Sequence, residues 1–144
     1  MIENRSAPPG AVVPVLVYDD VDKAIQWLRG AFGFEERFRT RPEADGTIHH
    51  AQVTIGEGAA ILSGRRGYRP STSAAIESLF IPVSEVDRHF DRAKAFGAKI
   101  VRPPASHEFG ERQYMAEDLE GHLWTFSQSV ANVDPETWGA IIRR

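Results

Sequence analysis

The sequence predicts an α+β fold built from two β-α-β-β-β modules, residues 12–63 and 78–128. Three observations predict it: each half has one helix pattern that ends in glycine, each half has one hairpin pattern, and matching dipeptides recur at nearly constant spacing. The 144-residue length suits a single domain, residues 1–144, made of both modules. A chain of this size buries roughly 68% of its unfolded surface, so its core forms without disulfides.

The first module begins with the apolar residues 12–18, which are typical of a buried strand. Pro14 lacks the N–H that an interior strand needs, so we expect this strand at a sheet edge. Asp20 is the expected N-cap of a helix whose apolar face repeats with helical spacing and ends at Gly33. The other expected strands of this module are residues 34–39, 48–55 and 59–63.

The second module repeats this series after a linker, residues 64–77, that is rich in Gly, Pro, Ser and Thr. Ser84 and Asp87 have the spacing of a capping box, and the helix that follows is expected to end at Gly97. The expected strands are residues 78–83, 99–102, 112–117 and 122–128, the second of them closed by Pro103-Pro104.

The repeat is supported by the offsets between matching residues. Asp20-Val21-Asp22-Lys23 recurs as Glu85-Val86-Asp87-Arg88 at an offset of 65, Phe32-Gly33 recurs as Phe96-Gly97 at 64, and Glu57-Gly58 recurs as Glu120-Gly121 at 63. A drift of two residues over three ordered matches is what short loop changes produce, so an internal duplication explains the pattern better than coincidence.

Composition excludes several function classes. The chain has no cysteine, which excludes a disulfide framework, a thiolate metal site and a cysteine nucleophile. A net charge of −3 favours neither nucleic acid nor an anionic membrane as partner. Residues 1–10 read as a polar, disordered arm without the pattern of a signal peptide, and the apolar runs are too short to span a bilayer. We therefore expect a cytoplasmic protein.

The C-terminal segment predicts a short helix, residues 134–143, with Asp134 as its N-cap and Pro135 at its first position. Trp138, Ile141 and Ile142 follow at helical spacing and leave an apolar stripe. Docking of this stripe on a second subunit would cover it, so we expect a homodimer.

Several short motifs, taken in order, resemble one protein family. They are Leu16-x-Tyr18-x-Asp20-Val21-x-x-Ala24, Phe32-Gly33-Phe34, Val83-x-Glu85-Val86-Asp87, Ala95-Phe96-Gly97-Ala98, Phe109-Gly110-x-Arg112-x-Tyr114 and Asp118-x-Glu120-Gly121-His122-x-Trp124. Their order and spacing resemble the vicinal oxygen chelate superfamily, which includes glyoxalase I, the extradiol dioxygenases and the bleomycin-resistance proteins. The last motif is similar to the branch of bleomycin-resistance and PhnB-like proteins. The resemblance implies a curled eight-stranded mixed sheet around a shared cavity, and a mostly dimeric family.

Metal-dependent members of that family place four ligands in the cavity, one in the first and one in the last strand of each module. By resemblance and by the repeat offsets, these slots fall on Val13, Leu62, Ser78 and Thr125. Two apolar side chains and two neutral hydroxyls are poor ligands for a divalent ion, which prefers carboxylate or imidazole. The sequence therefore predicts no metal cofactor in the usual site.

The five histidines do not rebuild that site, since adjacent His49 and His50 point to opposite faces of a strand. His50 is the best ligand-binding candidate, because Gln52 and Thr54 lie on its face and could form a polar pocket wall. A surface or hydrogen-bonded histidine remains the alternative for each.

The second hairpin carries the other candidates. Arg112 and Tyr114 share a strand face and could present a guanidinium and a phenol to an anionic or carbonyl-bearing ligand. The alternative is that Arg112 pairs with a neighbouring carboxylate, Glu111 or Asp118, and that Tyr114 belongs to the core. His107 and Phe109 precede this strand, where family members often close the cavity mouth.

Two function hypotheses follow from the resemblance. The first is a binding protein whose metal-free cavity holds a small, partly aromatic or anionic molecule, with antibiotic or toxin sequestration as one such role. The second is a lyase, isomerase or dioxygenase that uses a non-standard site, such as His50, Arg112 and Tyr114. The candidate ligand-binding residues are His50, Gln52, Leu62, Ser78, His107, Phe109, Arg112, Tyr114 and Thr125.

Overall fold

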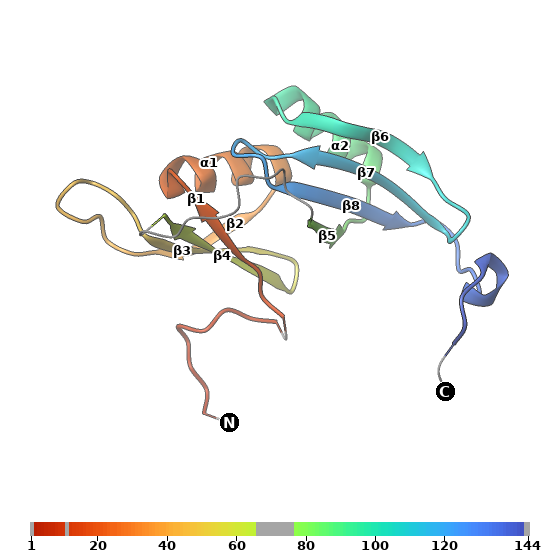
Figure 1. Ribbon diagram of the computed structural model, residues 1–144, viewed down its shortest axis with the longest axis horizontal. Coiled ribbons are helices and arrows are strands. Elements are labelled where there is room, and N and C mark those ends of the chain that lie inside the picture. The colour runs from red at the N-terminus through yellow and green to blue at the C-terminus, as the bar shows by residue number, and fades with distance from the viewer. Residues whose placement is uncertain (1, 11, 66–76, 143–144) are drawn as a thin grey trace. The chain divides into compact units, whose positions relative to one another are not determined.

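The computed structural model describes residues 2–10, 12–65 and 77–142. It divides into two compact units, Met1–Ser73 and Ala74–Arg144, and each unit carries one helix and one sheet (Figure 1). The interior of the expected linker, residues 66–76, lies outside the described residues.

The first unit is a mixed four-stranded sheet with one helix. Its elements are β1 (Val15–Tyr18), α1 (Val21–Phe32), β2 (Glu35–Arg39), β3 (His50–Ile55) and β4 (Gly58–Gly64). The strand order is β1-β4-β3-β2, with β1 parallel to β4 and the other pairs antiparallel.

The second unit repeats the arrangement. Its elements are β5 (Ser78–Pro82), α2 (Val86–Phe96), β6 (Lys99–Ser106), β7 (Glu111–Glu117), β8 (Leu123–Ser129) and a 3-10 turn, η1 (Pro135–Trp138). The strand order is β5-β8-β7-β6, and only β5 and β8 are parallel. The predicted α+β class with two β-α-β-β-β modules is confirmed.

The helix ends follow the sequence signals closely. Asp20 caps α1 by accepting a hydrogen bond from the Lys23 N–H at 3.0 Å. Gly33 ends α1 with φ of 82°, and Gly97 ends α2 with φ of 110°. Both values lie in the left-handed region that glycine enters without a Cβ penalty, so the two glycines occupy equivalent helix ends, as predicted.

The expected capping box at Ser84 and Asp87 is wrong. The N-cap of α2 is Glu85, and among the described residues its side chain makes no capping hydrogen bond. Asp87 instead accepts hydrogen bonds from Arg112 on β7, with Nη2–Oδ1 at 3.0 Å. The spacing alone assigned the Asp87 carboxylate to the helix cap. In the structure this carboxylate instead forms a charge-assisted contact between α2 and β7.

The two strands that follow Pro14 or contain Pro103-Pro104 both lie at the edge of a sheet. β1, which follows Pro14, lies at one edge of the first sheet, as predicted. The second expectation, that Pro103-Pro104 ends its strand, is wrong, because β6 continues to Ser106. β6 is also an edge strand, where a missing N–H costs no ladder bond, and its register shifts between Arg102 and Ala105 absorb the two prolines.

The C-terminal segment is shorter in structure than its apolar spacing predicts. Asp134 does act as an N-cap, accepting from the Glu136 N–H at 3.0 Å, but only the single 3-10 turn η1 follows. Gly139, with φ of 104°, ends that turn. Its left-handed conformation interrupts the helix expected over residues 134–143.

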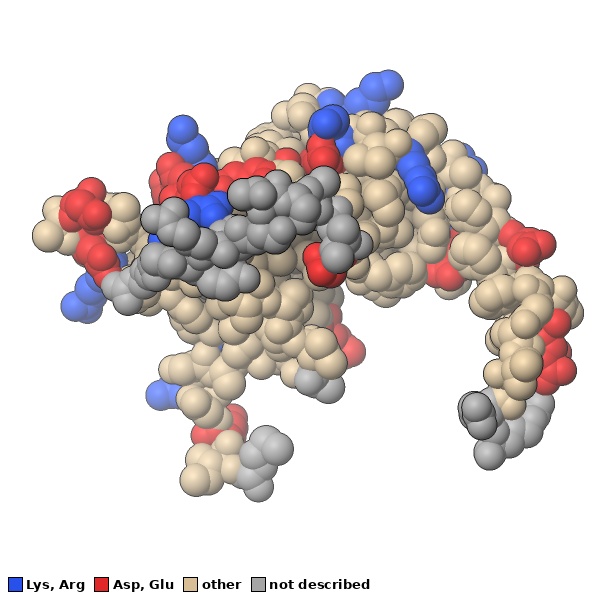
Figure 2. Space-filling model, in the orientation of Figure 1, with Lys and Arg blue, Asp and Glu red and all other residues tan. Residues whose placement is uncertain are grey.

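The described part of the chain carries both acidic and basic side chains on its surface (Figure 2). None of the described helices is long and apolar enough to cross a membrane. On the face drawn in Figure 2, acidic and basic side chains of the described residues are scattered among uncharged ones. This distribution agrees with the small net charge of −3.

Gly110 fixes the C-terminal strand end to the loop before β7. Its carbonyl oxygen accepts hydrogen bonds from the N–H groups of Val130 and Ala131, at 2.8 and 3.2 Å. Its φ is +87°, and a Cβ at this position would lie 2.5 Å from the Ala131 carbonyl oxygen. No side chain fits there without moving the backbone of residues 130–133.

We therefore expect Gly110→Ala to destabilise the protein more than Gly121→Ala. Gly121 has nearly the same φ, +90°, but its Cβ would meet nothing within 4 Å among the described residues. Gly121→Ala should cost about 1 kcal/mol for the left-handed conformation alone, and Gly110→Ala about 2–3 kcal/mol because a backbone clash is added. Urea unfolding of both variants measures the difference, and equal losses would contradict the close packing.

Candidate functional site

Each sheet has one face packed against its helix and one face that this helix leaves free. In the first unit the packed side chains include Leu16, Tyr18, Ala51, Val53, Ala60 and Leu62, all less than 9% exposed. Strand pairing places the alternate residues on the other side. We call this side the first open face; it carries Val15, Val17, Phe38, His50, Gln52, Thr54, Ala59, Ile61 and Ser63.

The second unit has the same two-sided sheet. Its packed face carries Tyr114, Ala116, Trp124 and Phe126, and the His89 ring of α2 lies 4.2 Å from the Phe126 ring. The aromatic residues of β8 therefore lie under the helix, as their alternation with hydroxyl residues predicts. The opposite side, which we call the second open face, carries Ser78, Phe80, Gln113, Met115, Thr125 and Ser127.

A β-bulge concentrates functional groups on the first open face. The register of β2 against β3 shifts between Glu36 and Phe38, so that Arg37 is the extra residue. A bulge re-aims the side chain that it carries. The Arg37 guanidinium consequently reaches Gln52 across the sheet, with Nη1–Oε1 at 2.6 Å, and lies 5.3 Å from the centre of the Phe38 ring.

His50 and Gln52 lie together on this face, as the sequence predicts. The His50 Nε2 and Gln52 Nε2 atoms are 3.4 Å apart, and the His50 ring is stacked on Phe38 with centroids 5.9 Å apart. Gln52 is only 2% exposed although α1, the helix of the first unit, packs on the opposite face of the sheet. Its amide is satisfied by Arg37 and by the carbonyl oxygen of Ser6, which accepts from Nε2 at 2.9 Å.

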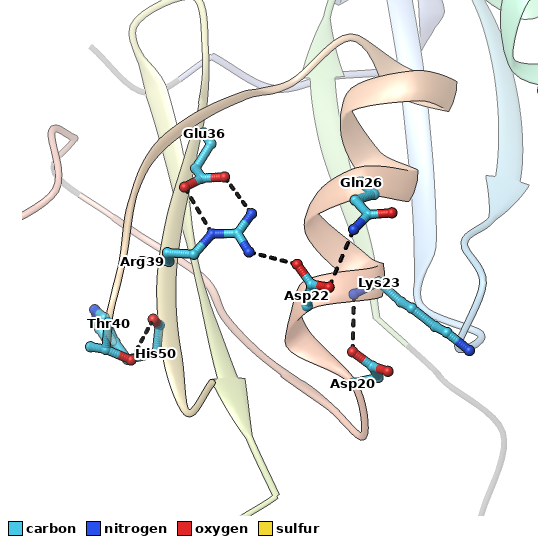
Figure 3. Close-up of polar contacts among 8 residues, drawn as sticks. All are labelled: Asp20, Asp22, Lys23, Gln26, Glu36, Arg39, Thr40 and His50. Carbon is cyan, nitrogen blue, oxygen red and sulfur yellow. Dashed lines mark hydrogen bonds and ion pairs between the residues drawn. The ribbon is translucent and has the colours of Figure 1, made fainter. Parts of the chain in front are cut away.

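Arg39, two residues after Arg37, has a different role. It points to the helix-packed face, between Glu36 of β2 and Asp22 of α1 (Figure 3), with ion pairs of 2.7 and 2.5 Å. The hydrogen bond from Arg39 holds the pKa of Glu36 below its usual value, although partial burial acts in the opposite direction. Arg39 thus fastens β2 to α1.

The second open face carries hydroxyl and amide groups beside apolar side chains. Ser78 Oγ and Thr125 Oγ1, which the sequence singles out, are 2.6 Å apart. Ser127 Oγ donates to Glu111 Oε1 at 2.7 Å and accepts from Gln113 Nε2 at 3.2 Å. Phe80 is 52% exposed and pairs with Thr125 across the strands. This face combines an exposed ring with oriented polar groups.

The strand register corrects one of the four metal slots. Phe80 pairs with Thr125 in the second unit, and Val15, the residue equivalent to Phe80, pairs with Ile61 in the first. The position equivalent to Thr125 is therefore Ile61, whereas Leu62 lies on the helix-packed face and is fully buried. The offset of 63 residues was taken from the hairpin turns, Glu57-Gly58 and Glu120-Gly121, whereas the strands β4 and β8 that follow them match at an offset of 64. Ile61, like Leu62, offers no lone pair to a metal.

The donor set at the four expected metal positions does not fit a divalent ion. The slots carry Val13, Ile61, Ser78 and Thr125, which supply two neutral hydroxyls. Across residues 2–10, 12–65 and 77–142, no group of three or more His, Cys, Asp or Glu side chains could hold a metal ion. Hydroxyls without a carboxylate beside them are weak ligands for a hard cation.

Arg112 and Tyr114 lie on the helix-packed face of the second sheet. Arg112 pairs with Asp87 of α2 and donates to Ser106 Oγ at 3.3 Å. Tyr114 is 1% exposed, and its hydroxyl lies 2.5 Å from His89 Nδ1. Burial raises the pKa of Tyr114 above its usual range. The core position considered for Tyr114 is the one observed, while the partner of Arg112 is Asp87 rather than Glu111 or Asp118.

His107 and Phe109 form a small aromatic cluster with the C-terminal turn. Their rings are stacked with centroids 5.0 Å apart and an interplanar angle of 3°. Trp138 of η1 packs on Phe109 at 5.6 Å. The C-terminal segment is thereby in contact with the loop before β7 of its own chain.

Comparison with known proteins identifies the family. The model of the Glyoxalase/Bleomycin resistance protein/Dioxygenase superfamily matches residues 11–126, which include the last strand of the second module up to Phe126. The chain belongs to this superfamily. The match is to the superfamily as a whole and does not distinguish its branches.

Individual relatives agree with this assignment. TioX from Micromonospora sp. ML1 is 36% identical, with a TM-score of 0.68, and the match covers 87% of this chain and 100% of TioX. An uncharacterized protein of Mycobacterium bovis is 30% identical over 132 residues, which cover 86% of each chain. The fosfomycin resistance protein FosX from Listeria monocytogenes, solved with Mn(II) and dihydroxypropylphosphonic acid, is 19% identical. Its TM-score of 0.63, over 81% of this chain and 87% of FosX, shows a shared fold alone.

Proposed function

We propose that this superfamily member is a small-molecule-binding protein that holds a partly aromatic or anionic compound against its open faces without a metal ion. The observation that carries the proposal is the combination of rings and convergent polar groups on these faces. The first offers Phe38 and His50 beside Gln52, and the second offers Phe80 beside Thr125. Ligand sites are typically apolar surfaces with a few well-placed polar groups.

We propose that the two modules, residues 12–63 and 78–128, form one domain over residues 1–144. Each module offers one open face on which an aromatic ring lies beside polar groups, and each face is a candidate surface for the compound.

Metal independence is tested by elemental analysis. We expect well under one equivalent of metal in protein dialysed against nickel, zinc, manganese or iron, because the four slots offer no anionic or imidazole ligand. Glyoxalase activity toward a hemithioacetal should be absent from the same samples. Stoichiometric retention that is lost in Ser78→Ala and Thr125→Ala would overturn the metal-free proposal. Retention that is lost in His50→Ala would move the metal to the first open face and favour an enzyme.

We further propose a homodimer that uses the C-terminal segment. Ile141 is 91% exposed and Val130 is 49% exposed, although Trp138 packs on Phe109. Removing such apolar side chains from water favours association of two chains. Light scattering of the full chain should give about twice the monomer mass of 16.0 kDa, and truncation before Asp134 should shift the chain toward monomer. If the truncated chain stays dimeric at the same concentration, the segment serves its own subunit only.

A further inference from the structure

The N-terminal segment Glu3–Ser6, which we call the strap, lies on the first open face. The sequence predicts a disordered arm here, but two of its carbonyl oxygens accept hydrogen bonds from the sheet. Arg5 O accepts from Arg37 Nη2 at 2.6 Å, and Ser6 O accepts from Gln52 Nε2 at 2.9 Å. The strap and the Phe38 ring line a groove of about 670 Å³. The strap therefore takes up hydrogen-bond donors of Arg37 and Gln52 on the first open face.

The charge of Arg37 is unbalanced in this arrangement. Its guanidinium donates to the Gln52 side-chain oxygen and to the Arg5 carbonyl, both of them neutral acceptors. In the part of the chain that the structure describes, Arg37 forms no ion pair, whereas Arg39 on the opposite face contacts two carboxylates. Hydrogen bonds between a guanidinium and a carboxylate are roughly twice as strong as those between neutral groups. An anionic acceptor would suit Arg37 better than the strap does.

We infer that Arg37 and Gln52 form a recognition site for a carboxylate carried on an aromatic ring, and that the strap occupies this site until such a ligand displaces it. The carboxylate oxygens would replace the carbonyl oxygens of Arg5 and Ser6, and the ligand ring would lie along Phe38, where the strap now lies. This inference rests on the proposed function and names the class of ligand and the competitor at that site.

The strap lowers affinity because it competes within the same chain. The apparent association constant for a ligand equals the intrinsic constant multiplied by the fraction of molecules whose site is free. Removing residues 2–6 should leave the site free in every molecule. The chain without these residues should bind benzoate, used as the probe, about tenfold more tightly than the full chain in a calorimetric or NMR titration.

Two comparisons assign the gain to Arg37. In the shortened chain, Arg37→Gln should weaken benzoate binding about tenfold or more, since a charge-assisted bond is lost. The matched control is Arg41→Gln, which removes a nearby exposed arginine and should leave the affinity unchanged. Benzamide, the neutral analogue of the probe, should bind the shortened chain at least about tenfold less well than benzoate.

A second measurement uses the full chain and does not depend on truncation. Because the chain contains no cysteine, Glu3→Cys gives a single site for a nitroxide label. The label should broaden the amide signals of residues 38 and 52, and saturating benzoate should restore them. Broadening that is absent, or that benzoate does not relieve, would overturn the strap as occupant.

The outcomes separate this inference from the proposed function. Equal benzoate affinities of the full and shortened chains, or no benzoate binding by the shortened chain, would overturn the inference. An uncharged compound that binds the open faces under those conditions would leave the proposed function standing. A metal retained at the four slots would overturn the proposed function, and the nitroxide measurement would still decide whether the strap is docked.

Discussion

Leu62→Ala is expected to lower the free energy of unfolding by about 3 kcal/mol, the largest loss among single truncations on β4. Leu62 is fully buried on the helix-packed face of the first sheet. Removing its side-chain atoms leaves a cavity between β4 and α1, where the helix side chains cannot fully collapse. Urea unfolding followed by circular dichroism measures the loss.

The adjacent residue provides the control. Ile61 lies on the first open face and is only half-buried, so Ile61→Ala should cost about 1 kcal/mol. The same pair tests the register, because a one-residue shift exchanges the two faces of a strand. A larger loss for Ile61→Ala than for Leu62→Ala would place Leu62 on the ligand side, where the sequence offsets put it.

Asp118→Ala is expected to cost about 3–4 kcal/mol and to loosen the turn before β8. Asp118 is 6% exposed, and its carboxylate accepts from the indole N–H of Trp124 and from the backbone N–H groups of Glu120 and His122, each at 3.0 Å. Truncation would leave the buried indole N–H without this acceptor. The motif Asp118-x-x-Gly121-x-x-Trp124 therefore stabilises the turn between β7 and β8, whatever ligand the protein binds.

Asp118→Asn separates shape from charge at this position. The amide keeps one acceptor oxygen but turns an N–H₂ group toward one of the donors, so we expect about 2 kcal/mol of destabilisation. The matched control is Glu57→Gln in the equivalent turn of the first module, where the side chain is exposed and the change should be within about 0.5 kcal/mol. Asp118→Asn with wild-type stability would contradict the role of the carboxylate.

Local sequence signals predicted the ends of the helices better than the length of the strand at the sheet edge. Asp20, Gly33 and Gly97 act through their own backbone neighbours, so α1 begins and both helices end where these residues predict. The length of β6 depends instead on its place at the sheet edge, which a proline pair does not reveal. Gly139 shortens the C-terminal turn because one left-handed residue outweighs three apolar residues at helical spacing.

The sequence predicted the candidate site best where its residues lie on a single strand. The alternation of β3 places His50 and Gln52 on one face, and the structure brings them together. The sequence did not predict a role for Arg37, because strict alternation places its side chain on the sheet face opposite to that of Phe38. The bulge in β2 turns both side chains to the same face. The signal available in the sequence was the charged run Glu35-Glu36-Arg37, which fits a regular strand poorly.

The central claim is that a small molecule binds on the open faces without a metal ion. A crystal structure of the protein purified from its own host tests it most directly. We predict electron density for an organic compound against Phe38 or Phe80, with no ion coordinated by Ser78 or Thr125. A compound bound only on the helix-packed side, or one held through a metal at those two hydroxyls, would contradict the claim.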